Sequence, residues 1–234
     1  MAGATTISVK MAKAIAAEIN GLDRLFVDMN TYLPLVRADL DQILKLKKRS
    51  PTRHALRSLL FALASPQNRF DSNVVVARKL HGRLSELDSV DTICRLLMED
   101  KCGTVSSGGV ARAIFHSLDY IRNVGHFDAV TLRQKQSQGI LMGGGMKVTA
   151  MAAHLYDPND RCFTLDTHML RGIVRTVLGL EGTWSVSGTA YSILENALLG
   201  WSDSRYGAEY PFVIQWTMWC VFRGTFDSHV AIFN

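Results

Sequence analysis

Apolar residues recur at three- and four-residue steps along most of this chain, and alternating polar and apolar runs are scarce. This spacing is typical of helices with one buried side, and it predicts an all-α protein. Breaks such as Ser50-Pro51 separate the apolar segments. The predicted helices cover residues 35–46, 56–65, 73–84, 89–98, 109–123, 132–140, 146–156, 167–178 and 211–222.

The composition suits a compact globular protein of one or two domains, with 234 residues, 47% of them hydrophobic and 20% charged. No run of 18 or more apolar residues appears, so we expect no transmembrane helix and no membrane partner. The N-terminus lacks the basic start and continuous apolar block of a secretory signal, which predicts an intracellular protein. A formal net charge of +5 is compatible with nucleic acid as a partner, but it does not identify any one class of partner.

Cysteine spacing argues against a metal centre. Cys94, Cys102, Cys162 and Cys220 form neither a CxxC motif nor a tight cluster with histidine. We therefore expect no zinc or iron–sulfur site, and reduced thiols that are mostly buried.

A glycine-rich turn joins the helices predicted over 132–140 and 146–156. Gly143, Gly144 and Gly145 leave backbone N–H groups uncovered, and the next helix directs its positive end toward the same point. A single phosphate would fit there. Glycines that only make the turn are the alternative explanation, and the segment matches neither a Walker A nor a GxGxxG pattern.

Two titratable residues flank this region. Lys147 lies in the first turn of a helix, where the helix dipole disfavours a cation and so favours the neutral, nucleophilic amine. Asp166 lies at the start of the helix over 167–178, where backbone donors favour the ionised carboxylate. Each residue alone has a simple alternative, a solvated lysine and a helix cap. Together with a phosphate-binding hairpin, they would suit cleavage of an N-glycosidic bond, with the carboxylate stabilising a cationic sugar.

The string Leu141-Met142-Gly143-Gly144-Gly145-Met146-Lys147, followed by Leu165-Asp166-Thr167-His168, resembles the helix-hairpin-helix DNA glycosylase superfamily. That superfamily includes endonuclease III and 8-oxoguanine DNA glycosylase. The presence of both a lysine and an aspartate at these positions resembles the pattern of its bifunctional glycosylase/lyase branch. Met142 and Gly144 stand where the family has a proline and an aliphatic residue, which would loosen the turn, and the iron–sulfur cysteines of endonuclease III are absent.

The resemblance also implies roles for residues outside the motif. Gln67 or Asn68 would fill the gap left by an extruded base, and Arg112 lies where the family has a helix with a basic residue. Ordinary polar positions at a helix end remain the alternative for the first two. Residues expected to line a base pocket, with core packing as the alternative, are Met151, Gln215, Trp216, Trp219 and Phe222.

The implied mechanism holds duplex DNA at Gly143 and Gly145, with help from basic side chains and a monovalent cation at the hairpin, and extrudes one damaged or modified base. Asp166 would stabilise the sugar cation while Lys147 displaces the base, forms a Schiff base and cuts the strand by β-elimination. His168 would contact phosphate or serve as a structural histidine. No further cofactor and no metal is expected, and the protein would act as a cytoplasmic, nucleoid-associated monomer.

The implied architecture has two helical domains with the active site in the cleft between them. Residues 52–158 would form a barrel domain that carries the hairpin, and residues 1–51 with 159–234 the second domain. Two other functions remain open. One is a glycosylase-fold enzyme of phage-type base hypermodification, and the other is a DNA-binding module without catalysis.

Overall fold

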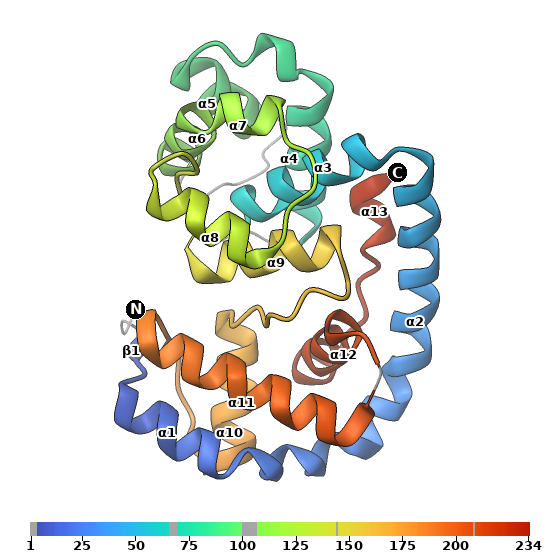
Figure 1. Ribbon diagram of the computed structural model, residues 1–234, viewed down its shortest axis with the longest axis vertical. Coiled ribbons are helices and arrows are strands. Elements are labelled where there is room, and N and C mark those ends of the chain that lie inside the picture. The colour runs from blue at the N-terminus through green and yellow to red at the C-terminus, as the bar shows by residue number, and fades with distance from the viewer. Residues whose placement is uncertain (1–3, 66–69, 100–106, 144, 208) are drawn as a thin grey trace. The chain divides into compact units, whose positions relative to one another are not determined.

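The computed structural model describes residues 4–65, 70–99, 107–143, 145–207 and 209–234. Helices account for most of them, which confirms the predicted all-α class (Figure 1). One short parallel ladder accompanies the helices in these ranges, between β1 (Thr5–Thr6) and β2 (Trp184–Ser185). The chain divides into two compact units, which are described separately below: unit 1 comprises Met1–Ala38 and Pro158–Asp227, and unit 2 comprises Asp39–Asp157 and Ser228–Asn234.

Unit 1 is built around packed helices whose apolar sides face one another. Helix α1 packs on α11, and α10 packs on η1 and on α12. Fully buried side chains such as Ile15, Leu22, Met29 and Trp201 fill this core. The elements of unit 1 besides the strands are α1 (Val9–Ala17), η1 (Ile19–Leu25), the first half of α2 (Phe26–Arg49), α10 (Thr167–Leu178), α11 (Gly188–Tyr206) and α12 (Pro211–Arg223).

Unit 2 is organised around α3 (Pro51–Ala64), in which every residue from His54 onward is buried. A helix that is covered on all sides needs neighbours on all sides, and α3 packs against α4, α6, α7, α9 and α13. These and the remaining elements of unit 2 are α4 (Phe70–Gly82), η2 (Leu84–Glu86), α5 (Val90–Met98), α6 (Ser107–His116), α7 (Leu118–Arg122), α8 (Ala129–Ser137), α9 (Met146–Tyr156) and α13 (Val230–Phe233).

The helix expected over 109–123 is divided at Ser117 into α6 and α7. The Ser117 backbone N–H donates to the carbonyls of Ala113 and Ile114, and its hydroxyl donates to Ala113 as well. A serine that bonds back to the preceding turn competes with regular helical bonding, which accounts for the break.

The units also differ in extent from the domains expected from the sequence. Helix α2 continues through the unit boundary between Ala38 and Asp39 without a break. Residues 228–234 belong to unit 2, because α13 packs on α3 and α4.

Candidate functional site

The glycine-rich hairpin of unit 2 connects α8 to α9 and lies against α6. Leu141 is buried, and the backbone N–H of Met142 donates to the Ser117 hydroxyl at 2.8 Å. Gly143 has φ of +70°, and a Cβ added to it would lie 2.6 Å from the Cβ of Ala113. The close approach to α6 therefore requires glycine at this position. The hydrogen bond that the Met142 N–H donates to Ser117 holds the hairpin against α6, and a proline at this position could not make it.

The hairpin ends at the N-terminus of α9 without a side-chain cap. Gly145 is the N-cap residue, and no side chain caps the helix there. Both Gly143 and Gly145 are exposed, whereas Gly144 lies outside the described residues. The first N–H groups of any helix have no acceptor within the helix, so the first turn of α9 can donate to an anion.

Lys147 is the second residue of α9 and is partly exposed. Its ammonium forms no ion pair or hydrogen bond with the described residues of unit 2. Arg112 is exposed on α6, one residue before the alanine that contacts the hairpin. Arg112 and Lys147 thus lie on α6 and α9 next to the hairpin, and α8 on its other side carries Arg133 and Lys135. Gln67 and Asn68, predicted to fill the gap in DNA, lie outside the described residues.

Asp166 is the N-cap residue of α10 in unit 1, with extended backbone angles of φ −85° and ψ 175°. Its Oδ1 accepts the backbone N–H of Met169 at 2.8 Å, as in an ordinary helix cap. Its Oδ2 accepts the indole N–H of Trp219, from α12, at 3.2 Å. Both carboxylate oxygens are therefore held by donors, and the second donor comes from another helix.

The extended segment before Asp166 is fixed by side chains from α11 and α12. The backbone N–H of Phe163 donates to Glu195, that of Thr164 to Gln215, and that of Leu165 to the Tyr191 hydroxyl. The same hydroxyl donates to the Phe163 carbonyl at 2.6 Å. These buried contacts bind the backbone N–H groups of the extended segment, and they fix the approach of the chain to Asp166.

Sequence reasoning missed Tyr191 and Glu195, and it assigned Gln215 to a base pocket. Tyr191 and Glu195 stand four residues apart on the buried side of α11. A tyrosine and a glutamate among buried apolar positions of one helix would have been a signal of a polar anchor, but the helix itself was not predicted. The structure places Gln215 in the same anchoring set, with 7% of its surface exposed.

The aromatic residues of α12 form a stack beside Asp166. Trp216 and Trp219 lie with ring centroids 4.4 Å apart and planes 14° apart, and the Arg223 guanidinium lies 4.3 Å from the Trp219 ring. Phe222 packs on α10, where a Cβ on Gly172 would lie 2.2 Å from its ring. Met151, the remaining residue predicted for a base pocket, is partly exposed on α9 in unit 2, whereas the four α12 residues belong to unit 1.

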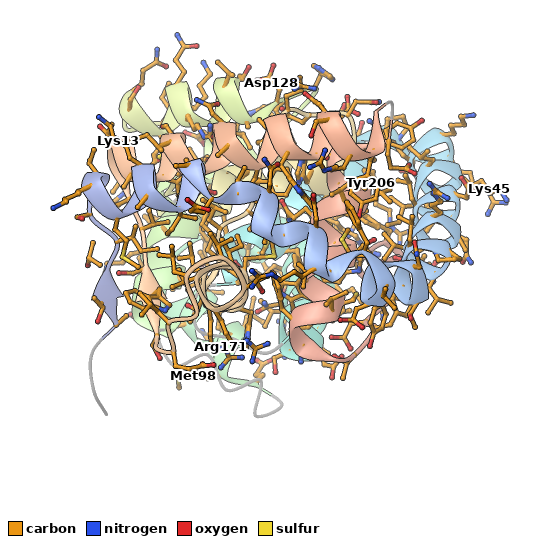
Figure 2. All side chains as sticks on the ribbon, turned by 90° about the horizontal axis from the view of Figure 1, so that it is seen from below. Lys13, Lys45, Met98, Asp128, Arg171 and Tyr206 are labelled. Atoms are coloured by element: carbon orange, nitrogen blue, oxygen red, sulfur yellow. The ribbon has the colours of Figure 1, made fainter. Side chains whose placement is uncertain are left out.

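His168 is exposed on the first turn of α10. Its ring meets the edge of Trp219 at a centroid distance of 6.3 Å, and its Nδ1 lies 3.3 Å from a guanidinium nitrogen of Arg171. Arg171 lies on the exposed side of α10 (Figure 2). The surface of unit 1 beside Asp166 therefore carries Arg171, which suits contact with an anionic chain, and Arg223, which is ion-paired with Asp227 at 2.7 Å.

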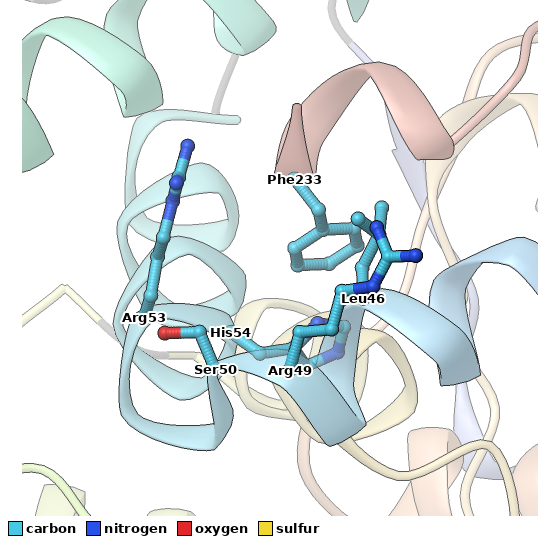
Figure 3. A pocket seen from close by; sticks show the side chains of 6 residues that line it. All are labelled: Leu46, Arg49, Ser50, Arg53, His54 and Phe233. Atoms are coloured by element: carbon cyan, nitrogen blue, oxygen red, sulfur yellow. The ribbon is translucent and has the colours of Figure 1, made fainter.

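A hollow of about 220 Å³ lies in unit 2 where α2 ends and α3 begins (Figure 3). None of the site residues predicted from the sequence lines it. Its lining residues are Leu46, Arg49, Ser50, Arg53, His54 and Phe233.

The chemistry of this hollow is limited by contacts that its residues already make. Burial lowers the pKa of His54 to about 4, so the imidazole is neutral at pH 7, and its Nε2 donates to the Leu155 carbonyl at 2.8 Å. Arg53 donates to the Asn234 carbonyl at 3.2 Å, and Phe233 stacks on the imidazole at 3.9 Å. The candidate chemistry therefore lies with Asp166 and Lys147 rather than with this hollow.

Across the described ranges, no group of three or more His, Cys, Asp or Glu side chains is arranged to hold a metal ion. No helix in those ranges is long and apolar enough to cross a membrane.

No family model matches this chain, and neither a curated protein nor a solved structure is significantly similar to it. The residues themselves therefore carry the functional argument.

Proposed function

We propose that this protein is a DNA glycosylase with an associated AP lyase activity, acting on a damaged or modified base in duplex DNA. The observation that carries the proposal is the arrangement at Asp166, whose carboxylate is held at both oxygens. An N-cap needs only one of these contacts. A carboxylate fixed at both oxygens suits the stabilisation of positive charge that develops on a sugar.

The hairpin supplies the proposed DNA contact. Its glycines expose backbone N–H groups at the uncapped start of α9, and the cation of Arg112 lies on the supporting helix. Phosphate recognition by amides and a helix N-terminus needs few positive charges, which agrees with a formal net charge of only +5. In this proposal Gly143 and Gly145 hold a phosphate of the target strand, and Gln67 or Asn68 fills the gap in the stack.

The proposed reaction begins with loss of a proton from Lys147. The Lys147 nitrogen then uses its lone pair to attack C1′ of the extruded nucleotide, the N-glycosidic bond breaks, and the base leaves with the bonding electrons and takes up a proton. Asp166 stabilises the positive charge on the sugar during this step. Opening of the sugar ring gives a Schiff base. Loss of a C2′ proton then expels the 3′ phosphate, which cuts the strand on the 3′ side of the lesion.

A panel of duplexes, each with one damaged or modified base, tests the proposal through release of free base and strand cleavage. Borohydride should trap a covalent protein–DNA adduct with the correct substrate, and Lys147→Gln should abolish trapping. Lys135→Gln, in α8, is the matched control and should still trap. Normal trapping by Lys147→Gln would remove that lysine from the mechanism.

Asp166→Asn separates catalysis from binding. Asparagine keeps an acceptor for the Met169 N–H, so the variant should fold and bind DNA but lose most base release. Asp119→Asn, at an exposed position on α7, is the control and should remain active. Duplex binding that is indifferent to both Asp166 and Lys147, without base release, would favour a DNA-binding module. Altered bases in the product DNA without free base would favour base modification.

A further inference from the structure

We infer that Trp219 is a positioning residue for Asp166, which it serves through its indole N–H rather than by stacking on a base. The inference rests on the proposed function, because it assigns Trp219 a role in the reaction at Asp166. Its starting point is the 3.2 Å hydrogen bond from the indole nitrogen to Oδ2.

The two hydrogen bonds of Asp166 act together on the plane of the carboxylate. The Met169 N–H alone would hold Oδ1 and leave the group free to turn about the bond to its Cβ. The Trp219 N–H holds the second oxygen from a different helix, so rotation would break one of the two bonds. A carboxylate that is oriented before substrate binds does not have to reorganise when charge develops.

Trp219 is itself held by two neighbours on α12. The Trp216 ring lies 4.4 Å from it in a nearly parallel stack, and the Arg223 guanidinium lies 4.3 Å from its centroid. An extruded base that stacked on Trp219 would have to compete with the Trp216 ring and the Arg223 guanidinium. The edge of the indole carries the N–H that donates to Asp166.

The distance between α10 and α12 also depends on a specific contact. Gly172, on α10, faces the Phe222 ring so closely that a Cβ would lie 2.2 Å from it. Gln215, on α12, accepts the backbone N–H of Thr164 two residues before Asp166. These contacts lie on either side of Trp219 along α12 and hold the helix where the indole reaches the carboxylate.

Trp219→Phe tests the role of the N–H, because phenylalanine keeps an aromatic ring next to Trp216 and Arg223 but has no donor. We expect unchanged duplex affinity and a fall in single-turnover base release of about 10- to 100-fold, the scale of a misplaced catalytic group. Trp184→Phe is the matched control and should retain full activity, since the buried Trp184 N–H has no acceptor among the described residues. The double variant Trp219→Phe/Asp166→Asn should be no slower than Asp166→Asn alone, because both changes act on the same carboxylate.

Indole ¹H–¹⁵N spectra test the contact without any substrate. Four tryptophans give four indole signals, and Trp219→Phe identifies its own. Asp166→Ala should shift that signal and speed its exchange with solvent, while the signal of Trp184 stays in place. An unchanged Trp219 signal in Asp166→Ala would overturn the inference.

The outcomes separate this inference from the proposed function. An active wild-type protein whose Trp219→Phe variant is folded and equally active would overturn the positioning role and leave the proposed function standing. A wild-type protein that releases no base from any duplex would overturn the proposed function, and the catalytic role of Trp219 with it.

Discussion

Two buried histidines should make unit 2 sensitive to mild acid. His54 and His229 are 2% and 3% exposed, and burial lowers the pKa of the first to about 4 and that of the second to about 3. Both are therefore neutral at pH 7. The approach of His229 Nδ1 to Asp39 at 3.9 Å is accordingly not an ion pair in the folded protein.

The sign of the effect follows from proton binding. Between the folded pKa and the ordinary histidine value of 6.5, the unfolded chain binds more protons than the folded one. The free energy of unfolding therefore falls as the pH drops from about 6.5 toward 4. Shifts of this size give a loss of about 2 kcal/mol per histidine at pH 5 relative to pH 7, or about 4 kcal/mol for the pair. That is a large part of the stability of a typical domain, about 5–15 kcal/mol.

One carboxylate acts in the opposite direction. Burial raises the pKa of Asp39 above its usual value of 3.8, against hydrogen bonds from the Ser228 hydroxyl and the His229 backbone N–H. A raised carboxyl pKa means that the folded state gains protons first, which adds stability as the pH falls through that range. Proton uptake by Asp39 therefore offsets part of the stability that the two histidines lose as the pH falls.

Urea unfolding at pH 7, 6 and 5 measures the effect, and the distribution of tryptophans helps to locate it. Trp184, Trp201, Trp216 and Trp219 all belong to unit 1, so their fluorescence reports on that unit. Amide hydrogen exchange followed by mass spectrometry reports on α3 and its neighbours in unit 2. Between pH 7 and pH 5, we expect the free energy of opening of α3, obtained from exchange, to fall by more than the free energy of unfolding of unit 1, obtained from fluorescence.

A variant assigns the effect to one side chain. His54→Gln does not titrate and keeps a donor for the Leu155 carbonyl, so it should lose about 2 kcal/mol less than the wild type between pH 7 and pH 5. His116→Gln, an exposed position on α6, should follow the wild type. Equal stability of the wild type at both pH values, or equal pH dependence in His54→Gln, would contradict the role of the buried histidines in acid sensitivity.

Three further substitutions test the packing that shapes the candidate site. Gly143→Ala should destabilise unit 2 by about 1–3 kcal/mol more than Gly139→Ala in urea unfolding, because both have positive φ but only the first meets a neighbouring Cβ. Gly172→Ala should lower the thermal midpoint of unit 1, while Gly200→Ala, with open space around it, should leave the midpoint equal or higher. Tyr191→Phe removes a hydroxyl that makes two buried hydrogen bonds and should cost about 1–3 kcal/mol by chemical denaturation.

Local signals in the sequence located the helices around the candidate site. The helices expected over 146–156 and 167–178 coincide with α9 and α10. For α10 the reason is a pair of end signals, an aspartate that caps the first turn and Gly179 in the left-handed conformation after the last. Such signals act over three or four residues, so the sequence alone is sufficient to recognise them.

Contacts between segments that are far apart in the chain could not be predicted from local patterns in the sequence. Trp219 meets a carboxylate that lies 53 positions earlier in the chain, and the Glu195 carboxylate accepts a backbone N–H from 32 positions earlier. Helix α11 was not predicted, so its polar anchors were not considered. The division at Ser117 was missed because the hydroxyl that breaks the helix also accepts the N–H of Met142 in a hairpin 25 positions away.

The two explanations of Asp166, a helix cap or a catalytic carboxylate, make different demands on its two oxygens. A cap requires only the bond from Oδ1 to the Met169 N–H, and asparagine supplies an equivalent acceptor at little cost in stability. The bond from Trp219 to Oδ2 exceeds that requirement, because it draws on a separate helix whose approach depends on a glycine contact. If Asp166 were only a cap, Asp166→Asn would keep the bond to the Met169 N–H, and loss of the Trp219 bond would leave base release unchanged. In the proposed function the same variant stays folded and loses base release, so stability and activity measured together on this one protein separate the two explanations.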